Sequence, residues 1–182
     1  LNEFQSLAKT PLLITMDAEW GPSQRLSDVF AHPWNMTLGA IQDNSLVREI
    51  SKRMAEQNKA LGIHFNFSPS VDVNNNSKNP IIGNRSFGED PINVYKKAKA
   101  YIQGHKDVGV YTSIKHFPGH GDTDKDSHKT LPVINGNMKR LNNVELFPFK
   151  KLIDDGLAES VMLAHLSVPA IDKRYPSSFC LL

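Results

Sequence analysis

Four short apolar segments recur along the chain and alternate with longer stretches that have helical periodicity. These segments cover residues 12–16, 63–68, 110–114 and 160–164, and each is too short for a stable helix. Their length and their alternation with helical patterns indicate strands. Strands that alternate with helices at this spacing predict a parallel sheet with right-handed crossover connections.

Three helices are predicted between and after these strands. The first covers 45–61 and is followed by Gly62, a residue that suits a helix end. The second covers 91–107, and the third covers 145–155. The apolar stripe of the first helix consists of Val47, Ile50, Met54 and Leu61, and the buried face of the second consists of Val94, Ala98, Tyr101 and Ile102. Asp90 is placed to cap the second helix, and Pro91 and Pro148 suit first turns.

The number of strands and helices indicates the fold class. A four-stranded parallel sheet has to be covered on both faces or closed into a barrel. Three helices suit part of a barrel, and a complete (β/α)8 barrel needs about 250 residues, whereas this chain has 182. We therefore predict an α/β fold that is a partial (β/α)8 TIM barrel, with about four parallel strands and intervening helices.

Composition and charge exclude several classes of protein. The chain is 40% hydrophobic and 22% charged, which fits a globular domain. Its net charge is +2, without the basic stripe of a nucleic-acid-binding protein. No apolar run approaches the ~18 residues of a membrane span. Cys180 is the only cysteine, which excludes an internal disulfide and a cysteine-based zinc site. No signal peptide is visible, and the sequence predicts no compartment.

Polar side chains follow all four predicted strands. They are Asp17 after the first strand, Asp72, Asn74 and Arg85 after the second, Lys115 and His116 after the third, and His165 after the fourth. The active sites of parallel α/β barrels form at the carboxyl ends of the strands. The sequence therefore predicts one polar site built from these residues.

The densest chemistry lies in residues 115–128, which contain three histidines and three aspartates. Asp126 and His128 are two residues apart, so in an extended segment both side chains point to the same side. A carboxylate that accepts a hydrogen bond from one imidazole nitrogen fixes the tautomer and makes the other nitrogen more basic. A histidine such as His128, held in this way by Asp126, can act as a general acid and then as a general base near neutral pH, and a solvent-exposed Asp-x-His in a mobile loop is the alternative.

A metal site is the other reading of this segment. The plausible ligands are His116, His120, Asp122, Asp124, Asp126 and His128. The spacing of the three aspartates resembles the start of a calcium loop, but Ser127 and Val133 stand where such a loop needs glycine and glutamate. We predict no metal ion and no cofactor.

Other residues suit the binding of a sugar. The planar guanidinium of Arg85 is suited to bidentate contacts, and Asp17 with Arg25 could grip vicinal hydroxyl groups. Trp20 offers an apolar face to a sugar ring, although simple packing of the loop explains it equally well.

Read together and in order, these motifs resemble the N-terminal catalytic domain of glycoside hydrolase family 3, in the branch of the bacterial β-N-acetylglucosaminidases. They are residues 16–21 with Arg25, 67–73, 84–88, 115–128 and 164–169. Residues 18–21 read Ala-Glu-Trp-Gly where many members read Gln/His-Glu-Gly-Gly. This difference changes the wall that the loop forms.

The resemblance implies roles for particular residues. Those that bind the N-acetylglucosamine ring are Asp17, Arg25, Arg85, Lys115 and His116, and we add His165 to the same carbohydrate site. The resemblance also implies that His128 is the acid/base of a retaining hydrolase for terminal β-linked N-acetylglucosamine, with Asp126 as its partner.

The resemblance further implies that residues 1–182 are a partial family 3 domain that lacks the first strand and the C-terminal part of the barrel. The family nucleophile would lie beyond Leu182, so we expect this chain alone to be inactive. Four alternatives remain open: a β-glucosidase-like hydrolase, a phosphorylase on the same scaffold, a metal-dependent barrel hydrolase and a non-catalytic sugar-binding module.

Overall fold

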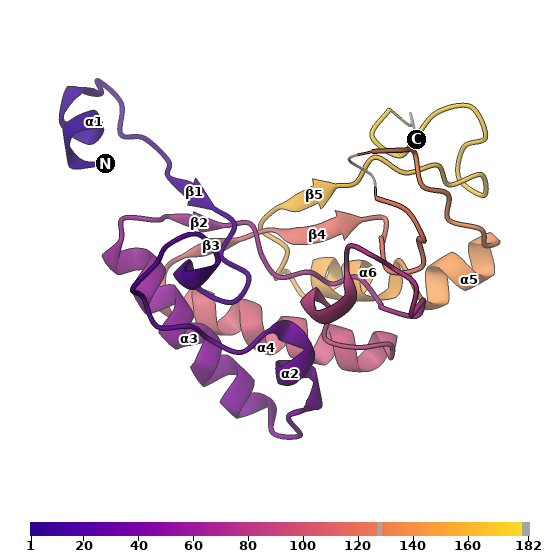
Figure 1. The fold of residues 1–182 in the computed structure, drawn as a ribbon, viewed down its shortest axis with the longest axis horizontal. Helices are drawn as coiled ribbons and strands as arrows, with labels where there is room; N and C mark the ends of the chain where they lie inside the picture. Colours follow the sequence, from indigo (N-terminus) through magenta and orange to yellow (C-terminus); the bar gives the residue numbers. More distant parts are fainter. Residues whose placement is uncertain (127–128, 180–182) are drawn as a thin grey trace.

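The computed structural model describes residues 1–126 and 129–179. Its strands are β1 (Thr15–Met16), β2 (Phe65–Asn66), β3 (Tyr111–Thr112), β4 (Ile114–Phe117) and β5 (Val161–Leu163), and every paired strand is parallel to its neighbour. They form a three-stranded sheet in the order β1-β2-β3 and a two-stranded sheet of β4 and β5. The strands follow one another in a curved row, with the longest helices on one side of it and the N-terminal helix apart from them (Figure 1). The predicted partial barrel is thus confirmed.

The third predicted strand differs from the structure. One strand was expected over 110–114, whereas the chain forms β3 and then β4, which extends to Phe117. Between them the Ser113 N–H donates to both Asn66 O and Ser68 O, at 3.2 and 3.1 Å, where the chain changes partners. An isolated parallel bridge between Ser70 and Lys115 then links the two sheets. Lys115 and His116 therefore lie within a strand rather than after it.

The three predicted helices are present, with shifted ends, as α3 (Asn44–Ala60), α4 (Pro91–Val108) and α6 (Phe147–Asp154). Three helices of six residues were not predicted, because a single turn or two gives little periodicity: α1 (Asn2–Leu7), α2 (Asn35–Ala40) and α5 (Met138–Asn143). Two 3-10 turns, Pro22–Gln24 and Gly83–Arg85, lie in the loops after β1 and β2.

Local chemistry explains where the two long helices begin and end. Asp43 caps α3 by accepting from Ser45 N, and Asp90 caps α4 by accepting from Ile92 N. Gly109 ends α4 in the left-handed conformation, with φ of +79°. Leu61, expected in the apolar stripe of the first helix, is exposed because it lies at the cap after the last turn of α3.

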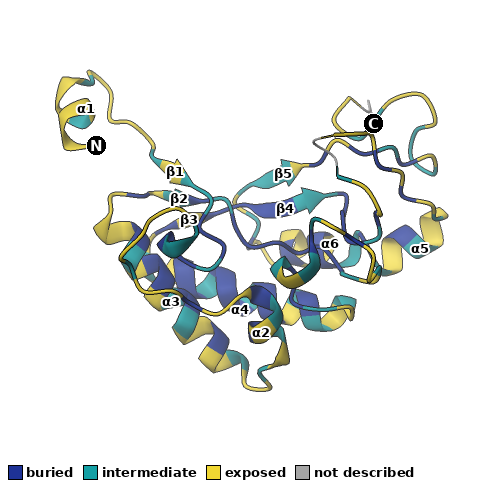
Figure 2. Ribbon diagram, viewed as in Figure 1, coloured by how far each residue is buried: buried dark blue, intermediate teal, exposed yellow. Residues whose placement is uncertain are grey.

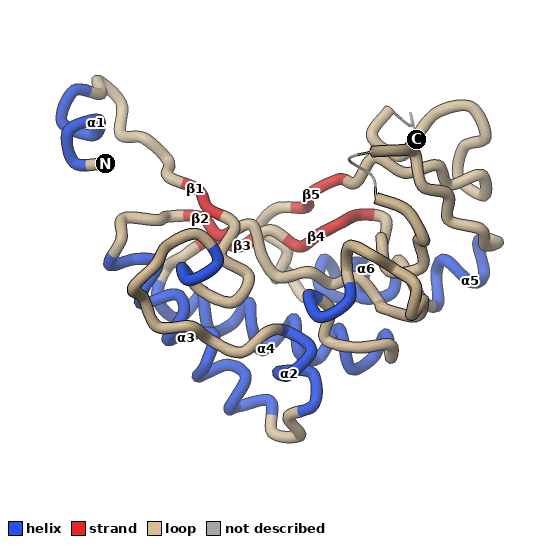
Figure 3. The backbone as a smooth tube through the Cα atoms, in the orientation of Figure 1, coloured by secondary structure: helices blue, strands red, loops and turns tan. Residues whose placement is uncertain are grey.

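The main core lies between the strands and helices α3, α4 and α6, where Figure 2 shows the buried segments gathered. The predicted buried face of α4 is confirmed, because Val94, Ala98, Tyr101 and Ile102 are fully buried. The tube view in Figure 3 shows that long loops follow β1, β2 and β4. These loops carry most of the candidate site residues.

Candidate active site

The carboxyl ends of the strands surround a polar pocket of about 590 Å³. All six residues expected to bind a sugar line this pocket: Asp17, Arg25, Arg85, Lys115, His116 and His165. Glu19, Trp20 and His120 line it as well. The fold therefore brings together residues that are up to 148 positions apart in the sequence (165 − 17), as the strand-end argument predicted.

A buried lysine forms the floor of the pocket. The Nζ atom of Lys115 lies 2.9 Å from Asp17 Oδ1 and 2.9 Å from Glu19 Oε1, and its side chain is 2% exposed. Burial alone would raise the pKa of both carboxyl groups, yet both pKa values lie below their ordinary range. The pKa of Glu19 is lowered chiefly by Arg85 and Lys115, and that of Asp17 chiefly by Lys115. Both carboxylates are thus ionised beside a cation that is shielded from water.

Arg85 joins this ion-pair network from the loop after β2. Its Nη2 and Nε atoms lie 2.8 and 3.1 Å from the two oxygens of Glu19, in a bidentate arrangement. The same Nη2 atom lies 3.2 Å from His116 Nε2. Because a guanidinium only donates, His116 Nε2 accepts this hydrogen bond.

Asp72 organises the other side of His116. Its carboxylate, which is fully buried, accepts hydrogen bonds from His116 Nδ1 at 2.7 Å, from His120 N at 2.6 Å and from Ser70 Oγ at 2.8 Å. Burial would raise the pKa of Asp72, but the His116 imidazole and these hydrogen bonds hold it far below its ordinary value. Asp72 therefore fixes both the tautomer and the position of His116.

A buried polar network holds the backbone that carries Asp17 and Glu19. The side-chain amide of Asn66 accepts from Ala18 N and donates to Ala18 O, both at 3.0 Å. The Tyr101 hydroxyl donates to Glu19 O at 3.1 Å. Since Asn66 is in β2 and Tyr101 in α4, the segment after β1 is anchored to both the sheet and the helix layer.

Two of the expected residues lie at the more exposed edge of the pocket. Arg25 pairs with Asp17 at 3.2 Å, with the Arg25 side chain 51% exposed. His165 follows β5 and forms a 2.6 Å hydrogen bond through Nδ1 with Ser178 Oγ. These residues are therefore accessible to a ligand that enters the pocket.

The expected acid/base pair is described only in part. His128 lies outside the described residues. Asp126 is half-buried, and its carbonyl oxygen accepts from Lys129 N and Thr130 N at 3.0 Å. Asp126 is not among the described residues that line the pocket. The pairing of Asp126 with His128 therefore stays a prediction.

Sequence reasoning gave Glu19 no role, placed Asp72 in the site only as a residue that follows a strand, and named His120 only as a possible metal ligand. Glu19 is two residues after Asp17, a spacing that puts both side chains on one side of an extended segment and could have revealed it. The Thr123 hydroxyl contacts His120 Nδ1 at 2.6 Å, and burial lowers the pKa of His120. The sequence gave no signal for the pairing of Asp72 with His116 and His120, because these two partners are more than 40 positions away.

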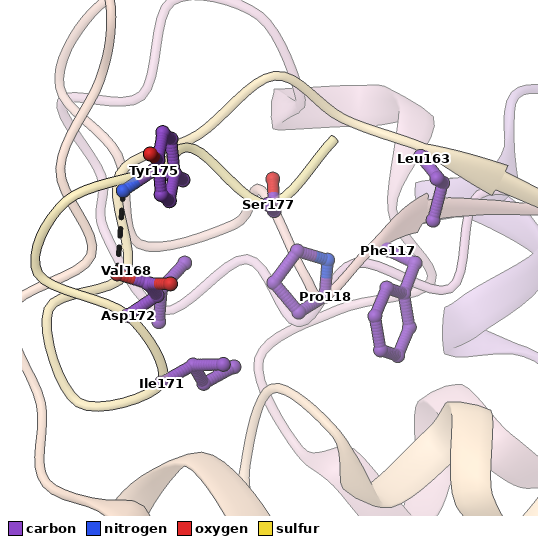
Figure 4. Close-up of a pocket in the computed structure, with 8 residues that line it drawn as sticks. All are labelled: Phe117, Pro118, Leu163, Val168, Ile171, Asp172, Tyr175 and Ser177. Atoms are coloured by element: carbon purple, nitrogen blue, oxygen red, sulfur yellow. Dashed lines mark hydrogen bonds between the residues drawn. The ribbon is translucent and has the colours of Figure 1, made fainter. Parts of the chain in front are cut away.

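A smaller, mostly apolar cavity of about 210 Å³ adjoins the polar pocket. Figure 4 shows its lining: Phe117, Pro118, Leu163, Val168, Ile171, Asp172, Tyr175 and Ser177. Asp172 Oδ1 accepts from Tyr175 N at 3.3 Å and so holds the loop beside this cavity. Leu163 lines both cavities, so the two share a wall at the end of β5.

The described residues contain neither a metal-binding cluster nor a membrane-spanning helix. Residues 1–126 and 129–179 contain no group of three or more His, Cys, Asp or Glu side chains that could hold a metal ion. Within the same residues, none of the helices has the length and apolar character needed to cross a membrane.

The chain matches a protein-family model and is similar to several known proteins. The family model described as glycosyl hydrolase family 3 N terminal domain matches residues 2–179. Beta-hexosaminidase A of Pseudoalteromonas piscicida is 37% identical over 173 residues, which cover 92% of this chain and 29% of that protein.

Two solved structures are similar over nearly the whole chain. A glycoside hydrolase family 3 β-N-acetylglucosaminidase from Paenibacillus sp. str. FPU-7 has 41% identity and a TM-score of 0.91, over 96% of this chain and 34% of that one. A β-glucoside phosphorylase bound to 2FGlc has 32% identity and a TM-score of 0.88, over 93% of this chain and 31% of that one. The chain thus spans about a third of the length of these relatives.

Proposed function

Because the chain belongs to glycoside hydrolase family 3, we propose that the protein removes terminal β-linked N-acetylglucosamine from glycosides. The observation that carries this proposal is the cluster of Asp17, Lys115, His116 and Arg85 in one pocket. Carboxylates accept from sugar hydroxyls while lysine and arginine donate to them, so the cluster can bind several hydroxyls of one ring. The relatives named β-hexosaminidase and β-N-acetylglucosaminidase support this choice of sugar.

The floor of the pocket is preorganised for this task. Lys115 and Glu19 are buried and hold each other in place, so little side-chain freedom is lost when a sugar binds. Hydrogen bonds from these groups that tighten as the ring flattens toward an oxocarbenium ion would accelerate the reaction.

We propose a retaining mechanism. A carboxylate attacks the anomeric carbon while His128 protonates the leaving oxygen, and the C–O bond to the leaving group breaks. His128 then removes a proton from water, which displaces the carboxylate and releases the sugar. Asp126 accepts a hydrogen bond from His128 and keeps it in the tautomer that this exchange needs.

The attacking carboxylate is proposed to come from outside residues 1–182. Neither Asp17 nor Asp72 matches the family position of the nucleophile, and each already has a close partner, Lys115 for Asp17 and His116 for Asp72. The relatives described above are about three times as long as this chain, which supports the proposal. Strong hydrolysis by the purified 182-residue chain would contradict it.

The decisive experiment measures turnover of a chromogenic N-acetyl-β-glucosaminide by the full-length natural protein that contains this chain, as wild type and as His128→Ala. We expect wild-type activity and a loss of about 100-fold or more in the variant. Lys125→Ala, which removes an exposed side chain of the same loop, is the matched control. An inactive wild type would reject the proposed reaction, and a fully active His128→Ala variant would reject the acid/base assignment.

A phosphorylase is the second candidate, and the similarity to the β-glucoside phosphorylase favours it. Phosphate would then replace water as acceptor, and the product would be a sugar 1-phosphate. Release of free sugar at an unchanged rate with and without phosphate would exclude this candidate. A strict requirement for phosphate would establish it.

A further inference from the structure

The two tryptophans of the chain stack against each other at the wall of the polar pocket. The ring centroids of Trp20 and Trp34 lie 4.0 Å apart, and the ring planes differ by 10°. Trp20 lines the pocket, and Trp34 is 42% exposed. Because Trp34 covers one face of the Trp20 ring, the remaining surface of Trp20 is the part available to the pocket.

The backbone that carries Trp20 is tightly fixed. Gly21 N donates to Ala18 O at 3.1 Å, and the side chain of Gln24 accepts from Glu19 N at 2.6 Å. Gly21 has φ of +84°, and a Cβ atom at this position would come within 2.7 Å of the His32 ring. Glycine is therefore needed directly after Trp20, both for the turn and for the close approach of the next loop.

The backbone that carries Trp34 is also anchored. His32 Nε2 forms a 3.0 Å hydrogen bond with Gln57 Oε1, which ties this loop to α3. Trp34 O accepts from Leu38 N at 3.2 Å and so starts α2. Both indole rings thus stand on fixed backbone, and the pair forms a preorganised flat surface rather than a mobile flap.

A sugar ring needs an apolar surface as well as hydrogen-bonding groups. Charged groups such as Lys115, Asp17 and Arg85 satisfy hydroxyls, but a β-gluco-configured pyranose also presents a flat face of C–H groups. The negative face of an aromatic ring attracts such weakly positive hydrogens and removes them from water. Among the described residues that line the pocket, Trp20 supplies the one Trp, Tyr or Phe ring.

We propose that the Trp20–Trp34 stack is the stacking wall of this pocket and holds the C–H face of the bound pyranose. Trp20 makes the contact, and Trp34 supports it from behind. This inference rests on the proposed function, because it concerns the sugar bound at that site. It explains why the chain carries tryptophan within residues 18–21, where the turn itself requires only Gly21.

Packing of the loop alone predicts a different outcome. If the stack only stabilised the segment, replacing either ring would lower the melting temperature and leave the affinity for sugar unchanged. If the stack binds the sugar, Trp20→Ala weakens binding even where the protein stays folded, and Trp20→Phe retains most of it because a ring is still present.

The experiment measures N-acetylglucosamine binding to the 182-residue chain by calorimetry and by tryptophan fluorescence, which here arises only from the two stacked rings. We expect a saturable fluorescence change with N-acetylglucosamine and none with mannitol, which has hydroxyls but no ring. Trp20→Ala should weaken binding about tenfold, Trp20→Phe by less than about threefold, and Trp34→Ala by an intermediate factor.

The same variants in the full-length protein give an independent measure, because loss of the wall should raise KM about tenfold. An affinity and a KM that are unchanged in Trp20→Ala would overturn the inference and leave the proposed function intact. Failure of the wild-type chain and of the full-length protein to bind N-acetylglucosamine would overturn both.

Discussion

Asp72, which is buried, pairs with the partly exposed imidazole of His116, and Asp72 Oδ2 lies 2.7 Å from His116 Nδ1. On its other side His116 Nε2 accepts from Arg85. These two partners require the proton on Nδ1, because Asp72 is ionised and only accepts. The pair therefore fixes the tautomer of His116, and both ring nitrogens already have partners within the protein.

Replacing Asp72 by asparagine is expected to lower kcat/KM of the full-length protein by about 100-fold. The amide keeps the shape but presents a donor or a weaker acceptor to His116, so the imidazole loses its preferred tautomer. Nitrogen NMR of the His116 ring should show loss of the Nδ1-protonated form. Asp154→Asn, at an exposed position of α6, is the matched control. An unchanged His116 spectrum would contradict this role for Asp72.

The pair of Lys115 and Glu19 is expected to be strongly coupled. Lys115→Met leaves two ionised carboxylates without their shared cation, so unfolding should become easier by about 3–5 kcal/mol. The double variant Lys115→Met/Glu19→Gln should lose less free energy of unfolding than the two single variants lose together, by about 0.5–3 kcal/mol. Urea unfolding of the four proteins measures this coupling.

A surface ion pair serves as the reference for that cycle. Arg48 and Asp107 join α3 to α4 with a 2.7 Å contact, but their side chains are 49% and 32% exposed. Arg48→Met should therefore destabilise the chain far less than Lys115→Met. Strictly additive losses in the Lys115/Glu19 cycle would show that the buried contact contributes no mutual stabilisation.

The sequence predicted the site better than it predicted the contacts within it. Asp17, Lys115 and His165 could be placed together because parallel strands bring their carboxyl ends to one side. The pairing of Asp72 with His116 could not, because it depends on how the loop after β2 folds beside β4, across 44 positions of sequence. Glu19 was missed because its buried ion pairs with Lys115 and Arg85 become visible only in the folded chain, and the carboxylate alone gives no sign of them.

The same difference appears in the elements of the fold. The helices α3 and α4 have 17 and 18 residues, which is enough to repeat an apolar stripe and so to be recognised. The helices α1, α2 and α5 have six residues each. Such short helices form because of local contacts, and their sequences show no repeated apolar stripe. The division of 110–117 into β3 and β4 depends on the partners of Ser113, which lie on another segment.

Gly121 is expected to tolerate no side chain. A Cβ atom there would lie 1.8 Å from Val73 O and 2.5 Å from Val73 C, so the loop that carries His120 would have to move away from the segment after Asp72. Gly121→Ala should therefore destabilise the chain by about 1–3 kcal/mol and weaken sugar binding.

Gly136→Ala is the control for this substitution. Its added methyl group would meet only the side chain of Arg140, at 3.3 Å, which would have to shift by a few tenths of an ångström and not by a backbone movement. Thermal unfolding and calorimetric titration with N-acetylglucosamine compare the two variants. Equal melting temperatures and affinities would mean that the approach of Gly121 to Val73 is not needed.

Stability is expected to fall as the pH drops through the range in which an unfolded histidine takes up a proton. Burial lowers the pKa of His105 to about 3 from its ordinary value of 6.5, and its ring nitrogens are held by Ser51 and Asn66. Between these two pKa values the unfolded chain binds the proton and the folded chain does not. The contribution of His105 is therefore present above pH 6.5 and is lost progressively as the pH falls toward 3.

This linkage predicts that protonation of His105 in the unfolded chain lowers the free energy of unfolding by about 2 kcal/mol between pH 7 and pH 5. Urea unfolding of the wild type and His105→Gln at both pH values isolates the term, because glutamine carries no titrating proton. The variant is less stable at pH 7 but should lose less on acidification. His64→Gln, at an exposed position, controls for the exchange of a histidine. Equal pH dependence in wild type and His105→Gln would mean that His105 is protonated equally in the folded and unfolded chains.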